Sequence, residues 1–146
     1  MSTLSKLYDD VVMDHIKNAR NYHALADAQR QAAGLNVLCG DSMTVYVQLS
    51  GDAIGATGFQ CECCGISMAS ASIMTEAVSG RPLAEVHALH EAVVTALDGG
   101  EDRLGDWDSG RAIVEAIRAY PSRRRCALLP WVTLAAALAG EAEARI

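Results

Sequence analysis

The hydrophobic period of the chain changes at Cys64-Gly65, and this change restricts the fold more than any other feature of the sequence. Before it, apolar and polar residues alternate over residues 43–49, which predicts a strand with one buried face. A turn at Ser50-Gly51-Asp52 and an extended segment over residues 53–60 then predict an antiparallel hairpin. After the change, apolar residues recur at spacings of three and four, as they do in amphipathic helices.

Helical patterns occupy most of the remaining sequence. They predict helices over residues 3–17 and 66–78, a helix opened by Pro82, a helix between Asp108 or Ser109 and Pro121, and a last helix over residues 126–139. A short helical turn over residues 24–32 and a third strand over residues 33–38 are further expectations. The order of helix, strands and then helices is typical of an α+β domain. We therefore expect one domain over residues 1–146, with a small antiparallel sheet of two or three strands packed against about five helices.

The composition excludes several classes of protein. A chain of 146 residues, 51% of them hydrophobic, can bury the core of one domain. Its net charge is −6 and its one basic run, Arg123-Arg124-Arg125, is short, so nucleic acid is a poor partner. Because the sequence has no apolar stretch of about 18 residues and its polar start lacks a signal-peptide core, we expect a cytoplasmic protein without a membrane partner. In a reducing compartment, five cysteines favour metal binding or thiol chemistry over a disulfide framework.

Three cysteines lie at boundaries between predicted elements. Cys39 precedes the first clear strand, Cys64 lies between the hairpin and a helix, and Cys126 begins the last helix. A helix N-terminus stabilises a thiolate through its free N–H groups and its dipole, and metal binding and sulfur transfer both need thiolates. Asp41 follows Cys39 by two residues, so in an extended segment both side chains project to the same side. Three thiolates and one carboxylate suit a tetrahedral zinc site or a two-iron cluster.

The spacing of these residues alone leaves the ligand set open. Separations of 25 and 62 residues between the three cysteines are unlike the short ligand pairs of a zinc ribbon. Cys126 is also explained as a buried structural cysteine, and Asp41 as an Asx-turn residue. Cys61 and Cys63 offer an alternative chelate. Without that chelate, Cys61 is a strand-end cysteine that faces the core and Cys63 is an exposed spare thiol.

Three short motifs occur in order along the chain: Cys39-Gly40-Asp41, Cys64-Gly65-Ile66-Ser67-Met68-Ala69-Ser70 and Arg125-Cys126-Ala127-Leu128-Leu129-Pro130-Trp131. The helical segment over residues 7–18 and the turn Asn18-Ala19-Arg20-Asn21 precede them. Together they resemble, over nearly the whole chain, the iron–sulfur cluster scaffold family typified by IscU (NifU N-terminal type). The resemblance is closer to the SufU branch, because residues 91–111 resemble an insertion of SufU-like proteins. Residues 119–123 also differ from the Leu-Pro-Pro-Val-Lys stretch that a dedicated chaperone grips in IscU-type members.

The resemblance implies how the site is built. The implied ligands are Cys39, Asp41, Cys64 and Cys126, and the implied cargo is a transient [2Fe-2S] cluster or Zn²⁺. Motif register places Cys64, rather than Cys63, at the second ligand position. The resemblance to SufU-like proteins favours Cys39 as the sulfur acceptor. Arg125 stands where IscU-type members carry a histidine; its guanidinium is either a solvated charge or a modulator that lowers a thiol pKa or pairs with Asp41.

Two functions follow from the resemblance, and a scaffold or carrier is favoured over an enzyme. In the first, a SufS-like cysteine desulfurase delivers persulfide sulfur, iron joins, and the cluster formed on the ligands passes to recipient apoproteins. In the second, zinc holds the same ligands and a freed thiolate accepts sulfur, without a scaffold role. A purely structural zinc domain is a third hypothesis, and the length of the chain argues against it, because a domain of this size can bury its own core.

Overall fold

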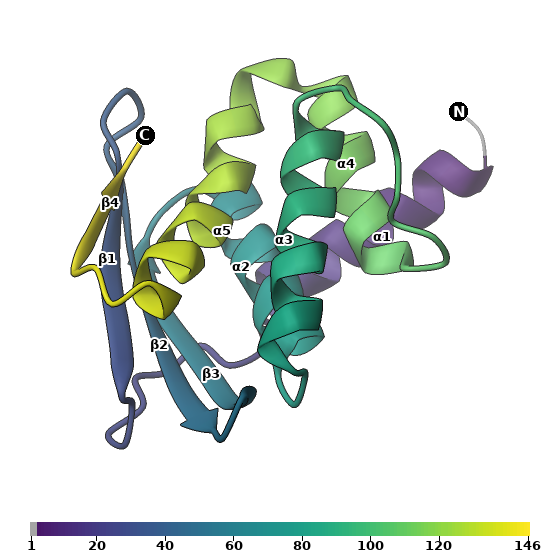
Figure 1. The fold of residues 1–146 in the computed structure, drawn as a ribbon. Coiled ribbons are helices and arrows are strands. Elements are labelled where there is room, and N and C mark those ends of the chain that lie inside the picture. The colour runs from purple at the N-terminus through teal and green to yellow at the C-terminus, as the bar shows by residue number, and fades with distance from the viewer. Residues whose placement is uncertain (1–2) are drawn as a thin grey trace.

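The computed structural model describes residues 3–146 as an α+β fold whose helices lie against one face of a single sheet (Figure 1). The elements follow in the order α1 (Thr3–Lys17), β1 (Arg30–Asn36), β2 (Asp41–Ser50), β3 (Ala53–Glu62), α2 (Gly65–Val78), α3 (Leu83–Leu97), α4 (Asp108–Ala119), a 3-10 helix η1 (Pro121–Arg123), α5 (Arg124–Leu138) and β4 (Glu143–Arg145). The expected fold class, the hairpin and the helices are therefore confirmed. Within these residues, no helix is both long enough and apolar enough to cross a membrane.

The sheet is mixed, which corrects the expectation of a purely antiparallel sheet of two or three strands. Its strand order is β3-β2-β1-β4, with β4 parallel to β1 and the other pairs antiparallel. A strand as short as β4 carries no readable periodicity, and it forms because Gly140, at φ +79°, lets the chain turn back after α5. β1 begins at Arg30, so the helical turn expected over residues 24–32 is also wrong.

The inner face of the sheet packs against α5. Alternate residues of β2 are buried, as its sequence pattern predicts. At Gly34 of β1 the helix comes so close that a Cβ atom there would lie only 1.9 Å from Thr133 Oγ1. Pro130 lies inside α5 rather than in its first turn, because the helix begins at Arg124 and not at Cys126. The contact between Gly34 of β1 and Thr133 of α5 holds the helix against the sheet, with the start of α5 above the ends of β1 and β2.

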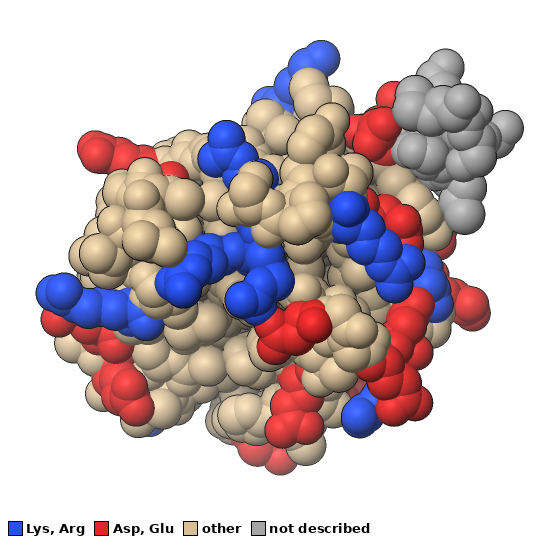
Figure 2. All heavy atoms as spheres, turned by 90° about the horizontal axis from the view of Figure 1, so that it is seen from above, with Lys and Arg blue, Asp and Glu red and all other residues tan. Residues whose placement is uncertain are grey.

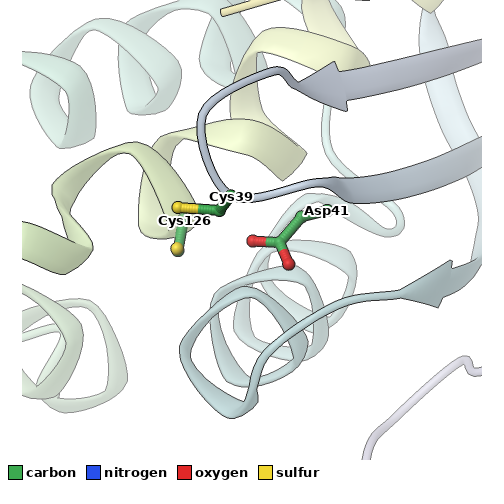
Figure 3. A group of neighbouring side chains, drawn as sticks. All are labelled: Cys39, Asp41 and Cys126. Carbon is green, nitrogen blue, oxygen red and sulfur yellow. The ribbon is translucent and has the colours of Figure 1, made fainter.

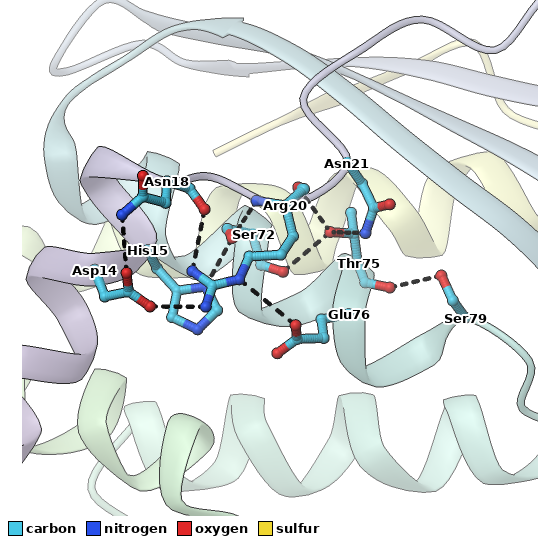
Figure 4. Close-up of polar contacts among 9 residues, drawn as sticks. All are labelled: Asp14, His15, Asn18, Arg20, Asn21, Ser72, Thr75, Glu76 and Ser79. Atoms are coloured by element: carbon cyan, nitrogen blue, oxygen red, sulfur yellow. Dashed lines mark hydrogen bonds and ion pairs between the residues drawn. The ribbon is translucent and has the colours of Figure 1, made fainter.

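Polar side chains join α1 and the following turn to α2 (Figure 4). His15 is only 3% exposed, although its charged neighbours predict a surface position, and its Nδ1 lies 2.7 Å from Ser72 Oγ. The main-chain N–H of Arg20 donates to the same hydroxyl at 2.9 Å. The Arg20 guanidinium also pairs with Asp14 at 2.7 Å and with Glu76 at 3.6 Å. These contacts hold α2, and with it Cys64 at its N-terminus, against the first helix.

Candidate metal centre

Cys39, Asp41 and Cys126 meet where β1 turns into β2 beside the start of α5 (Figure 3). Each offers a ligand atom, and these atoms all lie within 4.8 Å of one another. The turn is closed by a hydrogen bond from the Gly40 N–H to the Asn36 carbonyl at 2.9 Å, and Gly40 has a φ of +72°, which favours glycine. The tight turn therefore brings the thiol and the carboxylate together, as the Cys-Gly-Asp motif predicts.

The burial of these three side chains differs in a graded way. Cys126 is fully buried, Asp41 is 7% exposed, and the Cys39 thiol is exposed. Two ligand atoms are thus fixed by the protein interior, while the third is open to solvent. An exposed thiol is the one that a partner protein can reach, and sulfur acceptance by Cys39 stays a prediction.

Cys64 lies at the edge of this group. It occupies the N-cap position of α2, is half-buried, and falls outside the set of atoms within 4.8 Å. Its Sγ lies 3.7 Å from Ser67 Oγ, and that hydroxyl lies 3.4 Å from Asp41 Oδ2. Three of the four predicted ligands therefore converge, and the fourth adjoins them through Ser67.

The donor set fits a cation. Burial raises the pKa of the Cys126 thiol to about 12, and its hydrogen bonds with Cys64 and Asp41 and the charge of Cys64 act in the same direction. A buried thiol surrounded by acidic groups ionises only when a positive charge offsets the repulsion, and a bound metal ion supplies that charge. Thiolates with one carboxylate are donors that suit zinc or an iron–sulfur cluster.

A positive side chain already adjoins the thiols, and it belongs to Arg123. Its pKa is raised by hydrogen bonding to Cys126 and by the charges of Cys64, Cys126 and Cys39. The sequence assigned Arg123 only to the short basic run, and the structure places it at the N-cap of α5, three residues before Cys126. Arg125 is exposed, and modulation of the site by its guanidinium stays a prediction. Figure 2 shows several basic side chains on the face that carries the ends of α4 and the start of α5.

Asn36 is a second residue that the sequence did not reveal. It is fully buried, and its Nδ2 donates towards Cys126 Sγ at 4.0 Å. Its Oδ1 is buried and has no hydrogen-bond partner among the described residues. A side-chain amide that contacts the sulfur of a candidate ligand and keeps an unpaired oxygen is placed to orient that ligand if a metal ion binds.

Cys61 and Cys63 do not form a chelate with the centre, because a disulfide joins them, with their Cα atoms 5.5 Å apart. This corrects the expectation that Cys63 is a spare exposed thiol and that the cysteines stay unpaired; Cys63 is half-buried. Cys61 packs against the core, as expected of a strand-end residue. Within the described residues, the free thiols are those of Cys39, Cys64 and Cys126.

The comparison with protein families decides what kind of chain this is. The sequence profile of the NifU-like N-terminal domain matches residues 7–127. The chain belongs to this family. The predicted resemblance to IscU and SufU is thereby confirmed, and the ligand motifs of this NifU-like chain all begin within the matched residues.

Individual relatives of the NifU-like chain carry two kinds of name. The zinc-dependent sulfurtransferase SufU of Bacillus subtilis is 33% identical over 144 residues, which is 96% of this chain and 95% of that protein. The iron–sulfur cluster assembly scaffold protein IscU of Thermotoga maritima is 30% identical over 136 residues, covering 90% of this chain and 92% of that protein. Each alignment therefore covers nearly the whole of this chain and nearly the whole of the relative.

Solved structures share the fold. The crystal structure of FiSufU from Fervidobacterium islandicum superposes with a TM-score of 0.81 at 30% identity, covering 91% of this chain and 97% of that one. The N-terminal part of a NifU-like protein from Brucella abortus gives the same TM-score at 23% identity, covering 95% of this chain and 96% of that one. At that identity the second match shows the fold alone.

Proposed function

We propose that this chain is an iron–sulfur cluster assembly protein that accepts sulfur from a SufS-like cysteine desulfurase and passes a [2Fe-2S] cluster to apoproteins. The observation that carries the proposal is the convergence of ligand atoms from Cys39, Asp41 and Cys126 within 4.8 Å. Cys64 completes the ligand set from the N-terminus of α2. The exposed thiol of Cys39 is the sulfur acceptor, because it is the ligand that a partner can reach.

A carboxylate among thiolate ligands supports a role in transfer. Carboxylate oxygen is a harder ligand than thiolate and a poorer match for iron in a sulfide cluster. Asp41 therefore keeps the cargo labile, which a carrier needs. Arg123 holds a positive charge beside the thiols of the centre.

The surface around the centre suits a protein partner. Val37 and Leu38 are 61% and 75% exposed directly before Cys39, and Tyr120 is 65% exposed close to Arg123 in the sequence. Large apolar side chains exposed beside a reactive thiol mark an interaction surface. A desulfurase that presents apolar and acidic groups around its persulfide would complement this rim.

Zinc-dependent sulfur transfer without a scaffold role is the second candidate. The observation that favours it is the extent of the match to Bacillus subtilis SufU, a protein named as a zinc-dependent sulfurtransferase. In this case zinc occupies the same ligands, and partner docking frees the Cys39 thiolate to attack the desulfurase persulfide.

The test begins with metal and acid-labile sulfide in protein purified without oxygen. The scaffold role is supported if the protein contains iron and sulfide and shows visible charge-transfer bands. These bands should be lost in Cys39→Ser or Cys126→Ser. Zinc without sulfide, even after incubation with iron, a desulfurase and cysteine, supports sulfur transfer alone. The variant Asp41→Ala separates the roles further, because it should lengthen the life of a bound cluster but weaken the binding of zinc. Unchanged cluster lifetime and zinc affinity would remove Asp41 from both roles.

A further inference from the structure

The Cys61–Cys63 disulfide lies at the end of β3, next to the metal centre. Cys61 pairs with Met43 across the sheet, and Ser42 pairs with Glu62. Asp41 and Met43 are two positions apart on the buried face of β2. Because directly opposed residues of an antiparallel pair share a face, Cys61 lies on the same inner face as the Asp41 carboxylate. Cys64 follows Cys63 directly, so the Cα atoms of these two residues are about 3.8 Å apart.

The strand end that carries this pair is held in place. The hydroxyl of Tyr22 donates to the Cys61 carbonyl at 3.1 Å and accepts from the Cys61 N–H at 3.4 Å. The Tyr22 ring packs edge-on against Phe59, with ring centroids 5.1 Å apart. Cys61 and Cys63 are half-buried rather than sealed in the core. A second pair of sulfur atoms is therefore fixed beside the ligands without belonging to them.

A chemical requirement of the proposed function matches this placement. Sulfur that arrives as a persulfide is at the sulfane level, whereas sulfide in a cluster is reduced by two further electrons. Oxidation of two thiols to one disulfide releases two electrons. We propose that the Cys61–Cys63 dithiol reduces sulfane sulfur carried by the thiols of the centre and releases it as sulfide. This activity rests on the sulfur-accepting role proposed above.

The reaction balances in three steps. The Cys64 thiolate first attacks the outer sulfur of the persulfide on Cys39, the sulfur–sulfur bond breaks, and Cys39 leaves as a thiolate. The Cys63 thiolate then attacks the outer sulfur of the persulfide on Cys64, that sulfur–sulfur bond breaks, and Cys64 leaves as a thiolate while Cys63 becomes the persulfide. The Cys61 thiolate then attacks the inner sulfur of that persulfide, the Cys61–Cys63 disulfide forms, and HS⁻ leaves. The disulfide in the structure is the oxidised product of this sequence. An external dithiol reductant returns the pair to its reduced form with two electrons and two protons.

The experiment uses the full chain, freed of metal, reduced, and desalted without oxygen. One equivalent of glutathione persulfide is added, released sulfide is trapped with a bimane reagent, and protein-bound sulfane sulfur is measured by cyanolysis. Wild-type protein should release about one sulfide per chain and gain the Cys61–Cys63 disulfide, seen by mass spectrometry. Cys61→Ser should take up the sulfur but release about tenfold less sulfide, because the thiol that attacks the inner sulfur of the Cys63 persulfide is absent and only slower attack by other thiols remains. Glu62→Gln, which changes the exposed residue between the two cysteines, is the matched control and should behave as the wild type.

Wild-type protein whose pair has been oxidised beforehand provides a test without any substitution, and it should behave as Cys61→Ser does. Equal sulfide release from reduced wild type, oxidised wild type and Cys61→Ser, with equal sulfur uptake, would overturn the proposal and leave the sulfur-accepting role intact. Absence of sulfur uptake by every form would contradict the proposed function and this activity together. A disulfide that only stabilises the fold would change the melting temperature without changing sulfide release.

Discussion

The hydroxyl of Ser67 donates a 3.0 Å hydrogen bond to the main-chain carbonyl of Cys126. The reason lies four residues further along α5, where Pro130 has no N–H to donate to that carbonyl. Ser67 and Cys126 are both buried, so the Ser67 hydroxyl replaces the hydrogen bond that the missing N–H of Pro130 cannot give to the Cys126 carbonyl. The same hydroxyl lies 3.4 Å from Asp41 Oδ2, so Ser67 links α2 to two of the proposed ligands.

Substitution Ser67→Ala should therefore lower both stability and zinc affinity. Loss of the bond to a buried carbonyl destabilises the fold by about 1–3 kcal/mol, and loss of an outer-shell contact weakens metal binding about 10-fold or more. Chemical denaturation and a competitive zinc titration measure the two effects. Ser70→Ala is the control: Ser70 donates to the Ala127 carbonyl at 2.7 Å and accepts from Trp131, away from the ligands. It should reduce stability and spare zinc affinity; equal affinities in both variants would refute the role given to Ser67.

Arg123 should control the reactivity of the thiols at the centre. In metal-free protein, Arg123→Ala should slow alkylation of Cys39 by about threefold at neutral pH, because the variant removes a positive charge that attracts the negatively charged sulfur nucleophile. Mass spectrometry of alkylated peptides follows the rate. Arg125→Ala is the comparison variant, because Arg125 is an exposed arginine two residues after Arg123. A slower rate in Arg125→Ala alone would assign the modulation to Arg125 instead.

Stability should fall in mild acid because His15 is buried and His90 is half-buried. Burial and the charge of Arg20 lower the pKa of His15 below its usual 6.5, and burial lowers the pKa of His90. The unfolded chain therefore binds protons first as the pH falls, so stability is complete above about pH 6.5 and is lost towards the lower folded pKa. His15→Gln should flatten the dependence of unfolding free energy on pH between about 7 and 5, as denaturant titrations would show. His87→Gln, at an exposed position, should leave that dependence unchanged.

The contact between β1 and α5 should tolerate no added methyl group. Gly34→Ala places a Cβ atom 1.9 Å from Thr133 Oγ1, and that hydroxyl is held by a 2.7 Å bond to the Leu129 carbonyl. Overpacking of this kind costs about 1–3 kcal/mol. The double variant Gly34→Ala/Thr133→Ala should recover part of the loss, and additive losses in the double-mutant cycle would argue against a direct clash.

Removal of metal should leave the chain folded. The buried apolar cluster extends from Val12 through the sheet to Ala137 and is built mainly from residues outside the ligand set. Far-ultraviolet circular dichroism before and after treatment with a chelator measures the effect. Loss of helical signal on chelation would support the structural zinc domain instead.

The regular elements could be predicted because their signals are local. Alternation over β2 and helical spacing over α4 each reflect one buried face, and both survive in the structure. The ligand motifs likewise placed Cys39, Asp41 and Cys126 together, since Gly40 closes a turn between two of them. Sequence patterns therefore predict those features of the fold that residues close together in the chain determine.

The remaining features depend on contacts between distant segments. β4 exists only because α5 returns the chain to the edge of β1, and His15 is buried only because α2 packs over it. Asn36 reaches Cys126 across 90 positions of sequence. The role of Arg123 depends on η1 and on the start of α5 at Arg124, whereas the sequence pattern placed the start of this helix at Cys126.

β4 has a practical consequence for anyone who handles this protein. The carbonyl of Ile146 accepts a 3.1 Å bond from the Val37 N–H, and the Ile146 N–H donates to Leu35 at 3.0 Å. Val37, the partner of Ile146, is two residues before Cys39. Residues added after Ile146 would therefore begin close to Cys39. A polyhistidine tag placed there would bring imidazole ligands to the rim of the metal centre and distort every measurement of its metal content, so purification handles belong at the opposite terminus.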